Sequence, residues 1–271
     1  MAHAGDAMIR KRWLIGVGVA VAVAALVLLR LLGGGQADKI WARIQREGVL
    51  RVGMDASYPP FEFVDGEGRF RGLDVDLAQA LAERWGVRLE IANVGFDGLY
   101  DALRNKQFDL IVSALPYDPF LRKDFAFSYS YFNAGLRWVA RPDVLATLAD
   151  PSGRRVAVQT GSSADVEART LQRRFPQMAL VTVDEVAQVG QALAEGDADA
   201  AILDGVSALQ FVAAHPQFAV GDALLTDEPY VIALPLDAPT LKREVNAALV
   251  DFRESGRLDA WIRQWVGGES E

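Results

Sequence analysis

Hydrophobic positions change between two periodicities along the chain, and each change predicts a boundary between a strand and a helix. Val49 to Met54 alternates as a strand, whereas Leu73 to Trp85 repeats its apolar residues at helical spacing. Gly86 suits the end of that helix. This first series predicts strands at 49–54, 87–94 and 108–113, with helices at 39–47, 73–85 and from 96 onward.

A second and similar series follows. It predicts strands at 136–140, 155–159, 180–183, 200–203 and 230–234, with helices at 144–150, 165–175, 184–195, 206–214, about 239–255 and 257–266. Strands that alternate with helices indicate parallel sheets with right-handed crossovers. Two units of this size predict an α/β protein with two lobes and a cleft between them.

The stretch from Asp109 to Ser128 joins a strand, a sharp turn, a short helix and a strand that leaves the domain. Pro116 and Pro119 end the first strand because proline cannot donate to a sheet. A turn at the carboxyl end of a buried strand is where open α/β sheets place ligands. We therefore expect this turn to form half of a ligand site.

Composition excludes several classes of function. The 271 residues carry a net charge of −8, which argues against a nucleic-acid partner. There is no Cys, and the only histidines are His3 and His215. Thiol catalysis, a His-rich or Cys-ligated metal site and a serine triad are therefore not expected. No phosphate-binding glycine loop is present, and we predict no cofactor and no catalytic residue.

The amino terminus predicts a membrane segment. Residues 1–12 form a basic cytoplasmic flank, and residues 13–32 are apolar over about 30 Å of helix. A retained anchor is favoured by the length of this segment, and a cleavable signal peptide is the alternative. Residues 33–46 form a tether and a short helix. Either alternative places residues 38–271 outside the cytoplasm, and the anchor would make the membrane a partner.

Several motifs occur together in a fixed order. They are VLRVGMDASYPPFEF, GLDVDLAQALAERWGV, VGFDGLYDAL, FDLIVSALPYDP, FAFSYSYF, VAVQTGSS, EGDADAAILD and EPYVIAL. Over roughly residues 47–267 the chain resembles the extracellular solute-binding proteins of the polar amino-acid class, family 3. The resemblance implies a type II periplasmic-binding-protein fold, with two lobes joined by hinge strands near 133–137 and 226–231. Lobe 1 would comprise 47–134 and 231–267, and lobe 2 would comprise 135–230.

The resemblance also implies ligand contacts at three acidic or aromatic positions. The family's aspartate at the place of Asp204 binds the α-ammonium of the ligand, although Asp204 also suits a helix N-cap. Phe96 matches an aromatic residue that lies over the ligand, with a place in the core as the alternative. Asp55 and Tyr58 match positions at the side-chain end of the pocket, and Asp55 could instead cap a turn.

Further contacts are expected from strand-end and helix-start groups. Ser113, Ala114 and Leu115 lie where the family uses mainly backbone groups. Ser162 and Ser163 open a helix whose free N–H groups and dipole suit a carboxylate, with a simple cap as the alternative.

Two residues depart from the family pattern. Leu121 occupies the place of the usual carboxylate-binding arginine, with Arg122 one position later, and Pro116 replaces a hydroxyl donor. Either Arg122 moves in, or the helix start at Gly161 binds the anion, or the ligand has no α-carboxylate. The acids Asp55 and Asp204, with Asp118 expected nearby, favour a cationic or amine-bearing ligand.

The resulting hypothesis is an extracytoplasmic binding protein that passes an amino acid or a related amine to the permease of an ABC importer. One alternative is a ligand-sensing ectodomain that works with a signalling partner. Another is an enzyme resembling cyclohexadienyl dehydratases, which the missing arginine disfavours because such chemistry needs firm carboxylate clamps.

Overall fold

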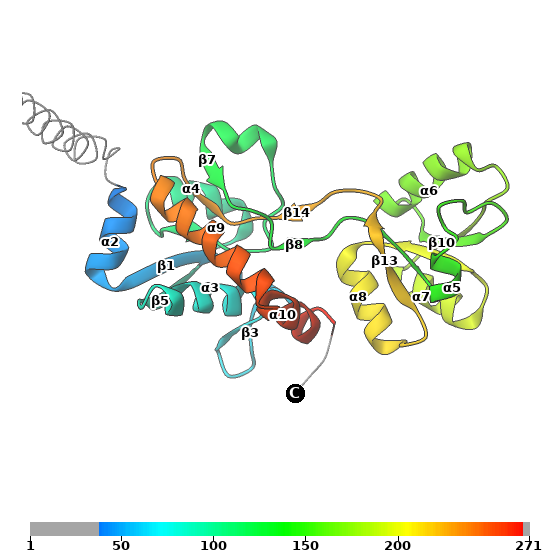
Figure 1. The fold of residues 1–271 in the computed structure, drawn as a ribbon, viewed down its shortest axis with the longest axis horizontal. Coiled ribbons are helices and arrows are strands. Elements are labelled where there is room, and N and C mark those ends of the chain that lie inside the picture. The colour runs from blue at the N-terminus through cyan, green and yellow to red at the C-terminus, as the bar shows by residue number, and fades with distance from the viewer. Residues whose placement is uncertain (1–37, 268–271) are drawn as a thin grey trace, which may run out of the picture.

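The computed structural model describes residues 38–267, which form two α/β lobes joined by two extended crossings (Figure 1). The expected two-lobed fold is therefore confirmed. The expected anchor or signal segment lies outside the described residues. Within 38–267, no helix has the length and apolar character needed to cross a membrane.

The first lobe is built on a five-stranded sheet in the order β5-β1-β6-β15-β7. β1 is parallel to β5 and β6, whereas β15 is antiparallel to β6 and β7. The residues between β1 and α3 form a small antiparallel sheet in the order β2-β3-β4. The elements of this lobe are α2 (Lys39–Glu47), β1 (Val49–Met54), β2 (Ser57–Tyr58), β3 (Glu62–Val64), β4 (Phe70–Arg71), α3 (Leu73–Arg84), β5 (Arg88–Asn93), η1 (Phe96–Gly98), α4 (Leu99–Arg104), β6 (Leu110–Ile111), η2 (Pro119–Lys123), β7 (Phe125–Phe127), β15 (Ala233–Pro235), α9 (Pro239–Glu254) and α10 (Arg257–Trp265).

The second lobe repeats this plan with a sheet in the order β11-β10-β12-β9-β13. β10 is parallel to β11 and β12, and β9 is antiparallel to β12 and β13. Its elements are β9 (Arg137–Ala140), α5 (Pro142–Leu145), β10 (Arg155–Gln159), α6 (Ser163–Arg174), β11 (Ala179–Val183), α7 (Val186–Glu195), β12 (Ala200–Leu203), α8 (Gly205–Ala214) and β13 (Ala219–Leu224).

The two crossings pair with each other between the lobes. β8 (Phe132–Asn133) is antiparallel to β14 (Pro229–Tyr230). The side chain of Asn133 donates to Asp227 Oδ1 at 2.6 Å and accepts from the backbone N–H groups of Gly135 and Glu228. The rings of Phe132 and Tyr230 both contact the buried ring of Phe61, at centroid distances of 5.2 and 5.4 Å. One end of the crossings is thus packed against the core of the first lobe.

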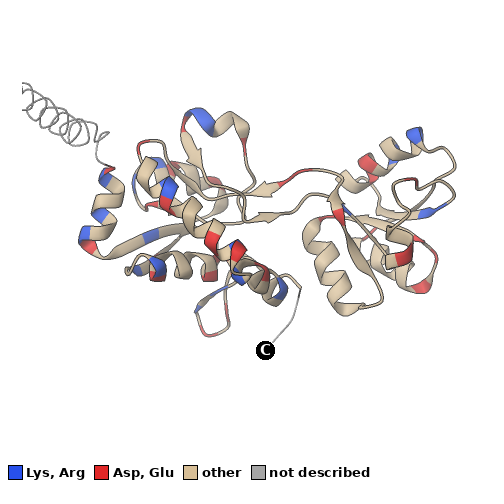
Figure 2. Ribbon diagram, viewed as in Figure 1, with Lys and Arg blue, Asp and Glu red and all other residues tan. Residues whose placement is uncertain are grey.

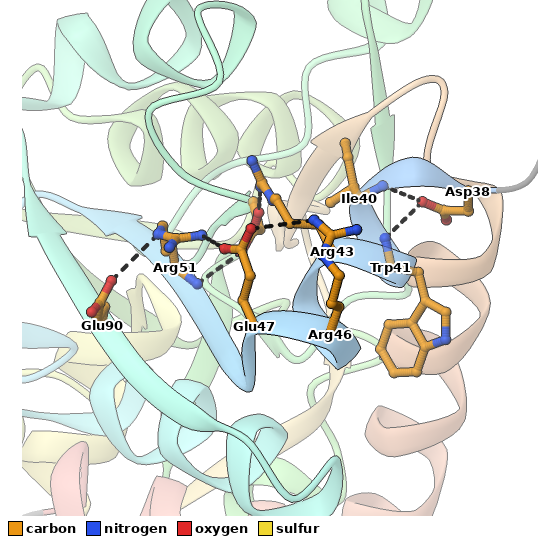
Figure 3. A network of polar contacts seen from close by, with 9 residues as sticks. Asp38, Ile40, Trp41, Arg43, Arg46, Glu47, Arg51 and Glu90 are labelled. Carbon is orange, nitrogen blue, oxygen red and sulfur yellow. Dashed lines mark hydrogen bonds and ion pairs between the residues drawn. The ribbon is translucent and has the colours of Figure 1, made fainter.

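A polar network fixes the start of the first lobe (Figure 3). Arg51 on β1 pairs with Glu47 at 3.0 Å and with Glu90 at 3.3 Å. Arg43 on α2 pairs with the buried carboxylate of Asp109, whose second oxygen accepts from the backbone N–H of Arg51 at 2.9 Å. Asp109 therefore ties α2 and β1 to the strand that leads into the candidate site.

The structure corrects two predictions about the stretch from 108 to 128. β6 contains only Leu110–Ile111 rather than the whole of 108–113, because the chain turns at Ala114, where φ is 39°. The strand Phe125–Phe127 does not leave the domain: as β7 it forms an edge of the first sheet, paired with β15. The chain leaves through β8 instead.

Other predicted boundaries are also wrong. The short helix expected at 144–150 is α5 at Pro142–Leu145, because Pro142 suits the first helical position. The strand expected at 230–234 is divided into β14 and β15. β13 was not expected, since Gly221 and Asp222 interrupt its apolar pattern and half of the strand is exposed.

Candidate functional site

Asp55, directly after β1, joins three segments of the first lobe. Its carboxylate accepts from the Ser57 hydroxyl at 2.7 Å and from the backbone N–H of Phe96 at 2.9 Å. Its own N–H donates to Ser113 Oγ at 3.0 Å. The structure thus brings Asp55, Phe96 and Ser113 together where β1 and β6 end, and Asp55 does cap the turn at η1.

The two predicted aromatic contacts lie at the surface of the first lobe. The side chain of Phe96 is 45% exposed and that of Tyr58 is 47% exposed. The Tyr58 ring stacks on the buried ring of Phe61, with centroids 5.7 Å apart. Phe96 is therefore not a core residue, and both rings offer apolar faces on the lobe that carries Asp55.

The strand-end residues after β6 are buried. Ser113 donates its hydroxyl proton to Glu62 Oε1 at 2.7 Å, and Ala114 donates its N–H to Asp74 Oδ2. The carbonyl of Leu115 accepts from Val231 N–H at 2.9 Å. These three residues are buried, and the Ser113 hydroxyl is held between Glu62 and the backbone of Asp55.

The position where the family pattern has a carboxylate-binding arginine holds an apolar residue, Leu121, and its surroundings in the structure are also apolar. Leu121 on η2 packs against the apolar cluster of Phe125 and Phe127. Arg122 is exposed, and among residues 38–267 it has no hydrogen bond or ion pair. Pro116 forms an isolated bridge to Tyr230 on the second crossing. The structure does not place Arg122 against Asp55 or Phe96.

The helix start on the second lobe already holds an acid. Ser162 is the N-cap of α6 and accepts from Asp165 N–H at 3.2 Å, and its hydroxyl donates to Gln159 O at 2.7 Å. The buried carboxylate of Asp165 accepts from Gly161 N–H at 3.1 Å and pairs with Arg169 at 2.8 Å. Ser163 is exposed. A ligand anion here would lie close to a resident negative charge.

Asp204, between β12 and α8, uses one of its two carboxylate oxygens to cap a helix. Its Oδ1 caps α8 by accepting from the N–H groups of Val206 and Ser207 at 3.0 and 2.9 Å. Its Oδ2 has no hydrogen-bond partner among the described residues. The next residue, Gly205, donates its N–H to Ala134 O on the first crossing at 3.0 Å. Asp204 therefore lies where the second lobe meets the crossings.

Candidate groups on the two lobes are not in contact. Among the described residues, no hydrogen bond joins Asp55 or Phe96 to Ser162, Ser163 or Asp204. Neither Asp55 nor Asp204 has an ion-pair partner in that part of the chain. Figure 2 shows Lys and Arg on both lobes, interspersed with Asp and Glu.

Comparison with known proteins shows to which family the chain belongs. A family model of bacterial extracellular solute-binding proteins, family 3, matches residues 50–268. The chain belongs to this family of solute-binding proteins. ArtP of Bacillus subtilis (strain 168), an arginine-binding extracellular protein, is 29% identical over 265 residues, which cover 96% of this chain and 99% of ArtP.

Two solved structures are also similar to this solute-binding protein. An ancestral cationic amino acid solute binding protein is 30% identical, with 83% of this chain and 98% of that chain covered and a TM-score of 0.58. An ancestral cyclohexadienyl dehydratase is 24% identical, with 86% and 98% covered and a TM-score of 0.74. The second similarity concerns the fold alone.

Sequence reasoning missed two acids beneath the site of this solute-binding protein, Glu62 on β3 and Asp74 on α3. Glu62 is 1% exposed and Asp74 is 0% exposed. Burial, and next the neighbouring Asp74, raises the pKa of Glu62 from 4.5 to about 11. Burial likewise raises the pKa of Asp74. Both acids stand within the quoted motifs PPFEF and GLDVDLA, but nothing in either motif shows that the two side chains meet.

Proposed function

We propose that this protein captures an amino acid or a related amine-bearing solute between its lobes and delivers it to an ABC importer. The observation that carries the proposal is a pair of acids that have no ion-pair partner within residues 38–267. Asp55 lies at the carboxyl end of β1 on one lobe, and Asp204 lies at the carboxyl end of β12 on the other. Partly exposed carboxylates at strand ends suit an ammonium or guanidinium group.

The proposed contacts divide between the lobes. Phe96 and Tyr58 would cover the apolar part of the solute, and Asp55 would bind its cationic end. Ser113, Ala114 and Leu115 would contribute strand-end groups from the same lobe. Asp204, Ser162 and Ser163 would close on the solute from the other lobe.

A positively charged group is proposed as the main recognised feature of the solute. Leu121 packs inward and Asp165 occupies the helix start, so two possible carboxylate sites are weakened. Arg122 is the remaining candidate because it is exposed and can change rotamer. The arginine specificity named for ArtP supports a cationic amino acid.

The test begins with thermal shifts of the purified full chain against basic amino acids, cystine, amines and polyamines. Binding raises the melting temperature because it adds RT ln(1 + [L]/Kd) to stability. For the best solute, we expect Asp204→Asn to weaken the calorimetric affinity by about 2–5 kcal/mol, as when one partner of a charge pair that binding buries is removed. Asparagine caps helices about as well as aspartate, so the fold should be retained.

The matched control is Glu185→Gln, which removes an exposed acid at the start of α7 on the same lobe. Its affinity should equal that of the wild type. Equal affinities for Asp204→Asn and the wild type would remove Asp204 from the site, and a screen with no thermal shift would contradict the proposed solute class.

We also infer that the chain is a binding protein rather than an enzyme, and that residues 13–32 hold it at the outer face of the membrane. Without an arginine clamp beside Asp55, a prephenate-like dicarboxylate would meet a carboxylate instead of a cation. Turnover of prephenate by the full chain would favour the dehydratase alternative.

A further inference from the structure

Glu62 and Asp74 form a carboxyl pair buried beneath the strand end that bears Ser113 and Ala114. They come from different elements, β3 and the first turn of α3. Their carboxyl groups lie close enough for each to affect the pKa of the other. Because neither reaches solvent, the arrangement must satisfy their four oxygen atoms within the protein.

Protein donors account for only two of these oxygens. Glu62 Oε1 accepts from the Ser113 hydroxyl at 2.7 Å, and Asp74 Oδ2 accepts from Ala114 N–H and from the Tyr131 hydroxyl at 2.9 Å. Glu62 Oε2 and Asp74 Oδ1 are buried and receive no donor from any residue between 38 and 267. No Lys or Arg among the described residues pairs with either acid.

A single proton on this carboxyl pair would supply the missing hydrogen-bond donor and would also remove one of the two negative charges. Two adjacent buried carboxylates without a cation would repel each other and would also carry a large desolvation cost. A single proton on Glu62 can be donated to Asp74, which then keeps one negative charge for Ala114 and Tyr131. Coupled buried carboxyl groups commonly share a proton in this way.

The pair supports a strained segment. Ala114 adopts φ of 39°, which residues with a β-carbon rarely occupy, and its N–H is held by Asp74. Ser113 is held between Glu62 and the backbone of Asp55. The pair therefore fixes the strand end and the acid that are proposed to meet the solute.

We propose that Glu62 and Asp74 share one proton and act as positioning residues that hold Ser113, Ala114 and Asp55 in binding geometry. The ligand part of this inference rests on the proposed function, whereas the shared proton does not. The titratable groups that face the pair are Asp55 after β1, Tyr131 before β8 and, beyond Tyr131, Tyr230 on β14.

The sign of the pH dependence follows from the pKa of Glu62, which burial raises to about 11. Above pH 4.5 the unfolded chain releases this proton while the folded chain keeps it. The stabilisation is therefore complete below pH 4.5 and declines as pH rises toward 11. Between pH 7 and 9, one retained proton changes the unfolding equilibrium constant about tenfold per pH unit.

The test compares the wild-type full chain with Glu62→Gln and with Glu83→Gln, an exposed acid on α3. At pH 8 the wild type and Glu83→Gln should show the infrared carbonyl stretch of a protonated carboxylic acid, and Glu62→Gln should lack it. From pH 7 to 9, denaturant titrations should show the wild-type unfolding constant rising about 100-fold relative to that of Glu62→Gln.

The solute identified by thermal shift provides the third measurement. Glutamine can donate to Asp74 and accept from Ser113, so Glu62→Gln should bind within about threefold of the wild type. Glu62→Ala should bind at least tenfold more weakly, because Ser113 and Asp74 lose their partner.

Each outcome has a separate meaning. Absence of the infrared band in the wild type at pH 8, or parallel pH curves for the wild type and Glu62→Gln, would overturn the shared proton. Wild-type affinity in Glu62→Ala would overturn the positioning role. A screen without any solute would contradict the proposed function while leaving the infrared result intact.

Discussion

Lys106 and Gly196 occupy the same local structure with different side chains. Each follows the last turn of a helix with positive φ, 60° for Lys106 and 80° for Gly196. At both ends the residue donates three positions back and the next residue donates five back, to Ala102 O after α4 and to Ala192 O after α7. This is the Schellman motif, in which glycine is favoured because it has no β-carbon.

We expect opposite effects from exchanging these residues. Lys106→Gly should raise the unfolding free energy by about 0.5–1 kcal/mol, because glycine relieves the backbone strain. Gly196→Ala should lower it by about 1 kcal/mol, since a β-carbon there contacts nothing within 4 Å and only the backbone conformation matters. Denaturant titration measures both, and changes of the same sign in the two variants would contradict this account.

At the residue scale, the sequence predicted where the site residues lie along strands and helices better than it predicted which groups they contact. Asp204 could be predicted to follow a buried strand, and the structure shows it capping α8 with one oxygen while the other has no partner in the described part of the chain. Leu121 could be predicted to replace an arginine, but its inward packing depends on Phe125 and Phe127. Glu62 and Asp74 could not be paired in advance, because their contact arises only when β3 packs on α3.

At the scale of elements, one side chain joins helices from opposite ends of the described chain. Asp38 caps α2 by accepting from the N–H groups of Ile40 and Trp41 at 3.1 and 2.9 Å (Figure 3). Its other oxygen accepts from Leu241 N–H at 2.9 Å, in the first turn of α9, whose own N-cap residue makes no side-chain bond. Two helix starts thus share one buried carboxylate.

Asp38→Ala should lower the unfolding free energy by about 2–3 kcal/mol. Loss of the α2 cap accounts for about 1 kcal/mol, and the buried N–H of Leu241 left without a partner accounts for the rest. Ser162→Ala, which removes the cap of α6 and a local hydrogen bond to Gln159 O but no bond to a second helix, is the comparison and should cost about 1 kcal/mol. Equal losses in ligand-free denaturation would show that the contact to α9 contributes nothing.

Elements with a regular apolar pattern could be predicted, and those set by tertiary contacts could not. β10 and β12 are runs of buried residues at the predicted bounds, and α7 ends at Glu195 before Gly196 as expected. β13 could not be recognised because it pairs with β9 while much of it stays exposed. The break between β14 and β15 reflects the crossing, where pairing changes from β8 to β7.

At the scale of the molecule, the second lobe has core clusters of its own, and it meets the first lobe through the crossings and through Val206 and Leu209 on α8, which pack against the first-lobe cluster (Figure 1). The proposed contacts on the two lobes share no hydrogen bond. If Asp55 and Asp204 bind one small solute, the lobes must approach each other, and the crossings must bend. A solute that binds both lobes at once favours that closed arrangement by population shift.

Gly135 lies where the backbones of the two crossings approach each other closely, and it provides a test of closure. A β-carbon at Gly135 would lie 1.9 Å from Thr226 O on the other crossing, so Gly135→Ala should force the two segments apart. We expect the solute selected by thermal shift to reduce the radius of gyration of the wild-type chain in X-ray scattering. In Gly135→Ala the reduction should be smaller and the affinity weaker.

The matched variant is Gly66→Ala, at a loop position where a β-carbon contacts nothing within 4 Å. It should compact on binding as the wild type does, because it changes no contact between the crossings. A wild-type response in Gly135→Ala would show that bending does not depend on this contact. A bound wild-type chain with an unchanged radius of gyration would mean that the solute contacts only one lobe, and then only one of the variants Asp55→Asn and Asp204→Asn should weaken its binding.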